Sequence, residues 1–315
     1  MSLQEKEQKI QELESKLDTI KNDPELASHE LVSDVEKKIT SLKEETYRHL
    51  SAYDHVYLAR KPARPHIKDY INNLFDDFME MQGDRYFGDD QAVVGGIATF
   101  NHLPVTVIGH QKGRSLDENM RCQFGMASPE GYRKGVRLMK QAEKFHRPII
   151  TFVDTPGAFP GIESEQNNIG EAIGQSLMFM SKVTVPVIVF VVGEGGSGGA
   201  LALSVGNYMG MLENAVYSVL SPEGFASILW KDLKGERVAE ACEVMKLTAA
   251  DLHQFGIVDE IIPEALGGIT ENPALTYRAI RQIISRELDT LTRKSAHDLV
   301  SERYKKIRKI GEVHG

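Results

Sequence analysis

The sequence predicts an α/β fold whose sheet is covered on both faces. Two observations support this prediction. Between residues 92 and 224, segments typical of strands alternate with segments typical of helices, which is the pattern of α/β domains. Each strand segment is short and almost entirely apolar, as expected where both faces of a sheet are buried.

Length and composition limit the class of protein. The 315 residues suffice for one large domain, or for one domain with an extension. The net charge of −8 argues against nucleic acid as a partner. The longest apolar run is too short to cross a bilayer, and the charged N-terminus lacks a signal-peptide pattern. Cys122 and Cys242 lie far apart, so we expect no zinc site, no disulfide framework and a cytoplasmic location.

Residues 1–60 are predicted to form a helical interaction arm. Two apolar stripes with helical spacing, separated by Pro24, indicate two amphipathic helices in a hairpin. The first stripe comprises Ile10, Leu13, Leu17 and Ile20, and the second Leu31, Val35, Ile39 and Leu42. Such stripes must be buried, either within the chain's own domain or against another subunit, and the sequence leaves both possibilities open.

A Pro/Arg-rich joint, residues 59–67, leads into the predicted main domain, residues 61–268. Its elements are expected in this order: a strand hairpin over 92–111, a helix over 131–145, a strand over 147–157, a helix over 164–183, a strand over 185–196, a helix opening at 197 and a strand over 214–224. Residues 269–315 return to charged, helical sequence and are treated as a C-terminal helical segment.

Two of these strands end in glycine-rich turns, and the second turn, GEGGSGG, has three interpretations. A dinucleotide-binding fingerprint would need an acidic residue closing the next strand; Glu213 has the distance but is expected before a strand. A serine-hydrolase elbow at Ser197 would need a downstream histidine acting as a base; His253, His297 and His314 all lie in polar or charged helical sequence.

The third interpretation is that bare backbone N–H groups hold a developing negative charge. The turn DTPGAFPG lies about forty residues earlier, and turns joined by a parallel βαβ unit emerge at one edge of a sheet. Glycine allows close approach of a ligand, and a helix starting near Gly198 adds its positive end. Two converging donors would form an oxyanion hole. The alternative, that both turns only permit tight strand–helix packing, stays open.

Several longer motifs carry a family resemblance. RPHIKDYINNLFDDFMEMQGDRYFGDDQAVVGGIATF, GHQKGR, FGMASPEGYRKGVRLMKQAEKF, DTPGAFPGIESE, GEGGSGGALAL and YSVLSPEGFASILWKD occur in this order. Together, over about residues 3–262, they resemble the α subunits of bacterial acetyl-CoA carboxylase carboxyltransferases. The resemblance implies a crotonase-like fold of ββα units, with an N-terminal helical extension.

The resemblance also implies a reaction and partners. Such enzymes transfer a carboxyl group from carboxybiotin, on the biotin carboxyl carrier protein, to acetyl-CoA, giving malonyl-CoA for fatty acid biosynthesis. The α subunit works with a β subunit in an α2β2 heterotetramer, beside biotin carboxylase, and zinc is expected only in the β subunit. This chain has no metal-ligand cluster, no biotin-attachment motif and no P-loop lysine. We expect no covalent cofactor here.

The site follows from the third interpretation. We expect the N–H groups of Gly198 and Gly199 to hold the biotin ureido oxygen, with Gly157 and Ala158 on the facing turn. Further substrate contacts are expected from Gly195, Gly196, Lys112, Arg114, Arg133 and Lys134, the basic residues pairing with coenzyme A phosphates or the transferred carboxylate. Two other functions remain open: an acyl-CoA hydratase or hydrolase using Glu163 or Glu165, and a non-catalytic scaffold that binds through the arm.

Overall fold

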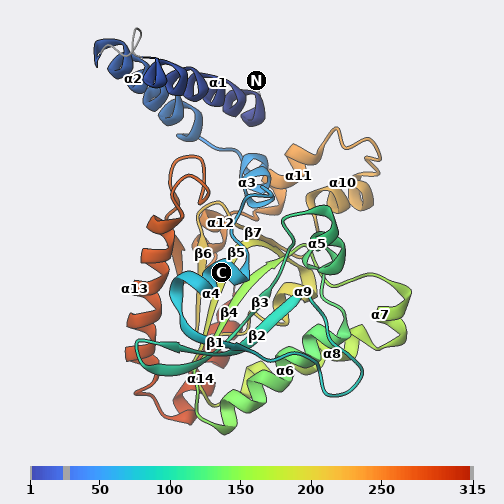
Figure 1. Cartoon of the computed structure of the whole chain (residues 1–315). Helices are drawn as coiled ribbons and strands as arrows, with labels where there is room; N and C mark the ends of the chain where they lie inside the picture. The colour runs from blue at the N-terminus through green and yellow to red at the C-terminus, as the bar shows by residue number, and fades with distance from the viewer. Residues whose placement is uncertain (1, 24–28, 313–315) are drawn as a thin grey trace.

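The arm is a helical hairpin that buries its apolar stripes between its own helices. The computed structural model describes residues 2–23 and 29–312, so Pro24 lies outside the described residues. Helices α1 (Leu3–Asn22) and α2 (His29–Tyr47) lie side by side at the edge of the molecule (Figure 1). The predicted hairpin is confirmed. Its small core consists of Ile10, Leu17 and Ile39, with Leu13, Val32, Val35, Leu42 and Tyr47 packed around them.

A buried carboxylate joins the arm to the body of the same chain. Glu7 accepts hydrogen bonds from Tyr47 at 2.7 Å and Tyr57 at 3.0 Å, and pairs with Lys61 at 2.7 Å. Helix α3 (Ala52–Ala59), although within residues 1–60, packs on α11 (Val238–Met245) and touches the hairpin through Tyr57. With α10 (Pro222–Trp230) these helices enclose a second apolar cluster around Val56, Ala226 and Cys242.

The described residues form one eight-stranded mixed sheet. Its order is β1-β2-β3-β4-β5-β6-β8, and β7 pairs with the far end of β5. The strands β1, β2 and β3 are antiparallel, and the others pair in parallel. Their bounds are β1 Asp76–Glu80, β2 Val93–Phe100, β3 Leu103–His110, β4 Ile149–Thr155, β5 Val187–Gly196, β6 Tyr208–Leu212, β7 Val216–Ser218 and β8 Glu260–Ile262.

The α/β prediction and the β2–β3 hairpin are confirmed, but short strands were missed. The sequence analysis did not foresee β1, β6 or β8, which are only three to five residues long. The strand expected over 214–224 shortens to β7, because Pro222 begins α10. The helix expected over 164–183 divides into α7 (Ile162–Gln166) and α8 (Ile169–Lys182), separated by Asn168 in the left-handed conformation with φ 63°.

Helices cover both faces of the sheet. A Cβ at Gly95 would lie within 3.4 Å of Ile108, its cross-strand partner, and would meet Leu138 of α6 (Pro129–Lys144). The next residue of β3, Gly109, points to the opposite face and lies against Ile67 of α4 (Ile67–Leu74). Hence α6 and α4 lie on opposite faces. On the α4 face, Tyr70, Phe152, Phe190 and Tyr208 form a row of ring contacts 5.1–6.3 Å apart.

The remaining helices complete the body. They are α5 (Leu116–Arg121), α9 (Ser197–Leu201), α12 (Ala249–Gln254), α13 (Pro273–Leu291) and α14 (Ala296–Lys309), with a short 3-10 turn at Gln123–Gly125. Buried residues of α13 and α14, among them Ile280, Ile284 and Leu299, belong to the main core. Both cysteines are free and buried. Among the described helices, none is long and apolar enough to cross a membrane.

Arg303 fastens the last helix to the end of α8. Its side chain is 1% exposed and donates to the carbonyl oxygens of Met180, Val183 and Val185 and to Oδ1 of Asn207, at 2.7–3.2 Å. The last carbonyls of a helix have no partner within it, so this guanidinium supplies the missing donors. Burial lowers the pKa of Arg303 to about 10.

We expect Arg303→Met to lower the free energy of unfolding by about 3 kcal/mol, because several buried carbonyls lose their donors. Urea denaturation followed by circular dichroism measures this change. Arg308→Met, on the exposed side of the same helix, is the matched control and should shift stability by less than about 0.5 kcal/mol. Equal unfolding midpoints for the two variants would contradict this role of Arg303.

Candidate active site

The two glycine-rich turns lie next to one another at one edge of the sheet. Strands β4 and β5 are parallel neighbours, with Ile149 paired to Val187 at one end and Thr155 paired to Gly195 at the other. The turns 156–161 and 195–199 therefore leave the sheet at the same edge, as predicted. Helix α9 begins immediately after β5, at Ser197.

The backbones of the two turns are in direct contact. A Cβ at Gly196 would overlap the carbonyl oxygen of Pro156, and a Cβ at Gly199 would lie 2.6 Å from the carbonyl carbon of Gly157 and 2.7 Å from the nitrogen of Ala158. Either distance is shorter than any ordinary contact of a side chain. The lack of a side chain at Gly196 and Gly199 is thus required by packing. The same holds for Gly195, where a Cβ would overlap the Tyr217 ring.

At two other glycines in these turns, the space that a side chain would occupy is free. No atom lies within 4 Å of the Cβ position at Gly157, whose φ of +153° also favours glycine. At Gly198 a Cβ would make only an ordinary contact with Ile173, at 3.5 Å. The first N–H groups of a helix have no carbonyl partner within it, and Gly198 and Gly199 belong to the first turn of α9. Gly198 therefore combines an uncrowded backbone with an N–H group that has no acceptor within its own helix.

A buried carboxylate, Asp154, ties the end of β4 to the start of the second turn. Its Oδ1 accepts the backbone N–H of Glu194 at 3.0 Å and pairs with Lys112 at 2.7 Å. Oδ2 lies 3.7 Å from Nδ1 of His66. Burial alone would raise the pKa of Asp154, but the Lys112 charge and these hydrogen bonds hold it well below the usual range. Asp154 is therefore a fixed anion beneath the turns.

Further charges extend this network. Lys112 also pairs with Glu194 at 3.1 Å, and Glu194 pairs with Arg60 at 2.7 Å. Arg64 donates to the carbonyl oxygen of Val192 in β5 at 2.7 Å. Arg60 and Arg64, like His66, come from the Pro/Arg-rich joint, to which the sequence analysis gave no role in the site. Two arginines and a histidine within seven residues were the signal that could have drawn attention to it.

The predicted basic residues lie in different environments, and one expectation, that for Lys134, needs correction. Lys134 is 1% exposed and bonds to Asp89 at 2.6 Å and to the Asp90 carbonyl at 2.7 Å. It stabilises the turn before β2 and cannot meet a coenzyme A phosphate there. Lys112 is committed to Asp154 and Glu194, so its charge is already balanced.

Arg114 lies at the surface, whereas Arg133 is partly buried. Arg114 is exposed and pairs with Asp69 at 2.5 Å. Arg133, on α6, donates to the carbonyl oxygen of Asn167 at 2.5 Å and lies over the Tyr86 ring, 5.3 Å from its centre. Its neighbour Tyr132 approaches the turns, since its hydroxyl would lie 2.8 Å from a Cβ at Gly199.

The alternative catalytic residues gain no support from the geometry. Glu163 and Glu165 lie exposed in the first turn of α7, where acidic residues favour a helix N-terminus. Ser197 is exposed with φ 51°, and among the described residues no histidine hydrogen-bonds to it. Glu213 does close a strand, β6, which the sequence analysis missed, but its carboxylate accepts the backbone N–H of Glu264 at 3.2 Å. Within residues 2–23 and 29–312, no cluster of three potential metal ligands occurs.

Comparison with known proteins shows which family the chain belongs to. The family described as acetyl co-enzyme A carboxylase carboxyltransferase-like matches residues 3–311. A protein of Bacillus cytotoxicus named acetyl-coenzyme A carboxylase carboxyl transferase subunit alpha is 53% identical over 279 residues, covering 89% of this chain and 86% of that protein. A protein of Geobacillus kaustophilus with the same name is 49% identical, covering 98% and 95% of the two chains.

Solved structures share the fold at low sequence identity. Transcarboxylase 12S, crystallised with methylmalonyl-coenzyme A, superposes with a TM-score of 0.61 at 21% identity, over 77% of this chain and 44% of that chain. The beta subunit of Pseudomonas aeruginosa geranyl-CoA carboxylase gives a TM-score of 0.57 at 15% identity, over 81% and 45%. This chain thus spans less than half the length of those two proteins.

The malonate decarboxylase MdcD–MdcE heterodimer of Pseudomonas also shares the fold, with a TM-score of 0.57 at 16% identity over 70% of this chain and 89% of that one. These neighbours confirm the crotonase-like prediction. The family match spans nearly the whole sequence, and the relatives are about half identical to it. The chain therefore belongs to the acetyl-CoA carboxylase carboxyltransferase family.

Proposed function

We propose that this chain is the α subunit of an acetyl-CoA carboxylase carboxyltransferase and forms malonyl-CoA from acetyl-CoA and carboxybiotin. The observation that carries the proposal is the meeting of the two turns, which leaves the backbone at Gly157 and Gly198 open while packing fixes the glycines around them. The carboxybiotin substrate arrives on the biotin carboxyl carrier protein, in the cytoplasm.

The chemistry needs donors rather than a side-chain base. When the N1–carboxyl bond of carboxybiotin breaks, carbon dioxide leaves and negative charge builds on the ureido oxygen. N–H groups of Gly198 and Gly199 aimed at this oxygen stabilise the anion more than the neutral ground state. N1 then takes a proton from the acetyl methyl group, and the resulting carbanion attacks the carbon dioxide. Gly157 and Ala158 line the opposite side.

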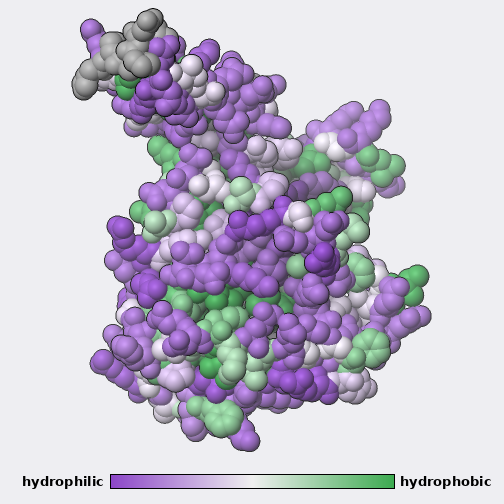
Figure 2. Space-filling view, in the orientation of Figure 1, coloured by the Kyte–Doolittle hydropathy of each residue, from purple (hydrophilic) through white to green (hydrophobic). Residues whose placement is uncertain are grey.

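Partners complete the site. The relatives carry the name subunit alpha, which implies a β subunit; we propose an α2β2 assembly with zinc in β and with biotin carboxylase nearby. Exposed apolar side chains on α5, α7 and α10 and their flanks offer surface for such contacts: Leu116, Met120, Ile162, Val219, Ile228 and Leu233, each more than 60% exposed. Hydrophobic groups are visible at the right edge of the body, whereas the arm is largely hydrophilic (Figure 2).

The proposal predicts that activity depends on the partner. The purified chain alone should not carboxylate free biotin with malonyl-CoA as the carboxyl donor, because the acyl-CoA side of the site is missing. Adding a carboxyltransferase β subunit should start the reaction, detected as acetyl-CoA release. Hydration of an acyl-CoA by the chain alone would instead favour the hydratase alternative.

We expect Gly198→Val to reduce carboxyl transfer at least about 100-fold, because the new side chain keeps the biotin oxygen from the N–H donors. The fold should persist, since the Cβ position is uncrowded. Steady-state kinetics of the α–β complex, with unfolding measured in parallel, checks both points. Gly174→Val on α8, also at an open position, is the control. Full activity in a folded Gly198→Val enzyme would remove this glycine from the mechanism.

Asp154 is expected to act as a positioning residue through the second turn. Asp154→Asn keeps an acceptor for the Glu194 N–H but removes the charge that holds Lys112. We expect kcat to fall about 10-fold with an unchanged KM for malonyl-CoA, because misplaced donors weaken only the transition state. Asp289→Asn, exposed on α13, should leave both constants unchanged. A raised KM at unchanged kcat would assign Asp154 to substrate binding instead.

A further inference from the structure

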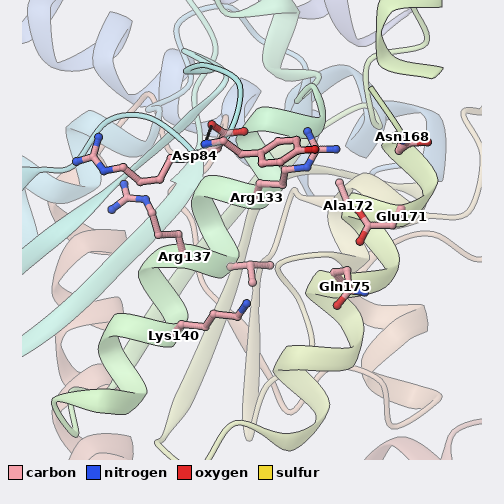
Figure 3. Close-up of a pocket in the computed structure, with 11 residues that line it drawn as sticks. Asp84, Arg133, Arg137, Lys140, Asn168, Glu171, Ala172 and Gln175 are labelled. Carbon is pink, nitrogen blue, oxygen red and sulfur yellow. Dashed lines mark hydrogen bonds between the residues drawn. The ribbon is translucent and has the colours of Figure 1, made fainter. Parts of the chain in front are cut away.

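A groove lies between α6 and α8, apart from the contact between the glycine turns. Its volume is about 800 Å³, which suits a ligand of nucleotide size. In Figure 3, Arg133, Arg137 and Lys140 descend along α6 on one side. On the other side stand Glu171 and Gln175 of α8 and Asn168, which immediately precedes that helix. The turn 84–86 closes the top, and Val136 and Ala172 give the groove an apolar floor.

The groove is rich in positive charge. Arg133, Arg137 and Lys140 follow one another at i, i+4 and i+7, so their Cα atoms span about 10 Å along one face of the helix. Arg85 adds a fourth cation from the adjoining turn. Within the described part of the chain, neither Arg85 nor Lys140 takes part in an ion pair.

Among the described residues, the acidic side chains that line the groove form no ion pair with these cations, although Arg133 pairs with Glu130 on its own helix at 3.7 Å. Oδ1 of Asp84 accepts three backbone N–H groups of its own turn, from Tyr86, Phe87 and Gly88, at 2.8–3.0 Å. Glu171 stands on the opposite wall. Burial, and then the nearby charge of Arg85, lower the pKa of Arg137, while Asp89 and Asp84 act in the opposite direction without offsetting this effect. Cations that repel one another in this way favour an anionic ligand, which would relieve the repulsion.

Arg137 is fixed in place for such a ligand. Its Nε donates to the carbonyl oxygen of Gly83 at 2.9 Å and its Nη2 to that of Met81 at 3.0 Å, so the guanidinium is held rigidly and Nη1 stays available. Rows of arginine and lysine side chains bind phosphate groups through charge-assisted hydrogen bonds. A row about 10 Å long suits more than one phosphate.

The groove also has features that inorganic phosphate would not need. The Tyr86 side chain is 84% exposed and lies against the Arg133 guanidinium, so one ring face can stack on a base. Asn168, Glu171 and Gln175 offer oxygen acceptors to sugar hydroxyls or an exocyclic amine, as acidic side chains do for ribose elsewhere. We propose that this groove binds a phosphorylated nucleoside, with its phosphates along α6 and its base at Tyr86.

Two sources share this chemistry: the 3′-phosphorylated ADP end of coenzyme A and a free nucleotide. In the first case the proposal rests on the proposed function and places part of the acyl-CoA on this subunit. In the second it adds a regulatory site. Binding is measured independently of carboxyl transfer, so failure of one proposal does not imply failure of the other.

Calorimetric titration of the α–β complex with ADP, adenosine 3′,5′-bisphosphate and pyrophosphate tests the site. We expect Lys140→Ala and Arg85→Ala each to raise the Kd of both nucleotides about 5- to 20-fold, because each removes one charge-assisted contact. Lys144→Ala, on the same helix and outside the groove, should change the Kd less than about twofold. Tyr86→Ala should weaken ADP binding without affecting pyrophosphate, and added salt should weaken all binding.

Competition identifies the source. If coenzyme A displaces ADP, the groove holds the nucleotide end of the substrate; if both bind together, it holds a free nucleotide. The proposal is overturned if neither nucleotide binds, or if the Lys140 and Arg85 variants bind nucleotides as tightly as Lys144→Ala does. It is also overturned if pyrophosphate binds as tightly as ADP and Tyr86→Ala leaves the Kd of ADP unchanged. Carboxyl transfer by the same preparations shows whether each variant is otherwise intact.

Discussion

The candidate active site depends on one constraint: two backbone turns pack against each other without an intervening side chain. Gly196 lies on Pro156, and Gly199 lies on Gly157 and Ala158. Any larger residue at 196 or 199 would push the turns apart. Parallel pairing of β4 and β5 fixes both strand ends. Because the glycines allow the turns to pack closely on each other, the sheet then determines where the backbone N–H groups of the turns lie. Packing thus requires glycine at Gly196 and Gly199, whereas the backbone at Gly157 and Gly198 is uncrowded.

Behind this contact, a charged network replaces the usual apolar packing. Asp154, Lys112, Glu194 and Arg60 form a chain of ion pairs at 2.7–3.1 Å. Asp154 is buried, and Lys112 and Glu194 are partly buried; charges removed from water in this way are costly to desolvate, and hydrogen-bonded partners make them tolerable. Their hydrogen bonds fix the orientation of these side chains more strictly than contacts between apolar side chains would. His110, whose pKa burial lowers to about 4, is neutral beside Asp154 at physiological pH and does not disturb the charge balance.

Local patterns were enough to predict the strands β4 and β5 and their turns, because a continuous apolar run that ends in glycine indicates a buried strand followed by a turn. Contacts between distant segments were not predictable. Lys112 and Asp154 are 42 residues apart, and only the sheet brings them together. Lys134 looked like a surface cation because a residue type does not reveal which helix face is buried. Asn168 divides a predicted helix through one positive φ, and strands as short as β8 carry too few residues to show a period.

The hydrogen bonds that Arg303 donates at the end of α8 have a consequence for biosynthesis. The carbonyls it serves lie 118–123 residues earlier in the chain. At ordinary rates of translation, roughly 5–20 residues per second, that segment waits roughly 6–24 s before its donor is made. The end of α8 therefore reaches its final hydrogen bonding only after residue 303 has been synthesised.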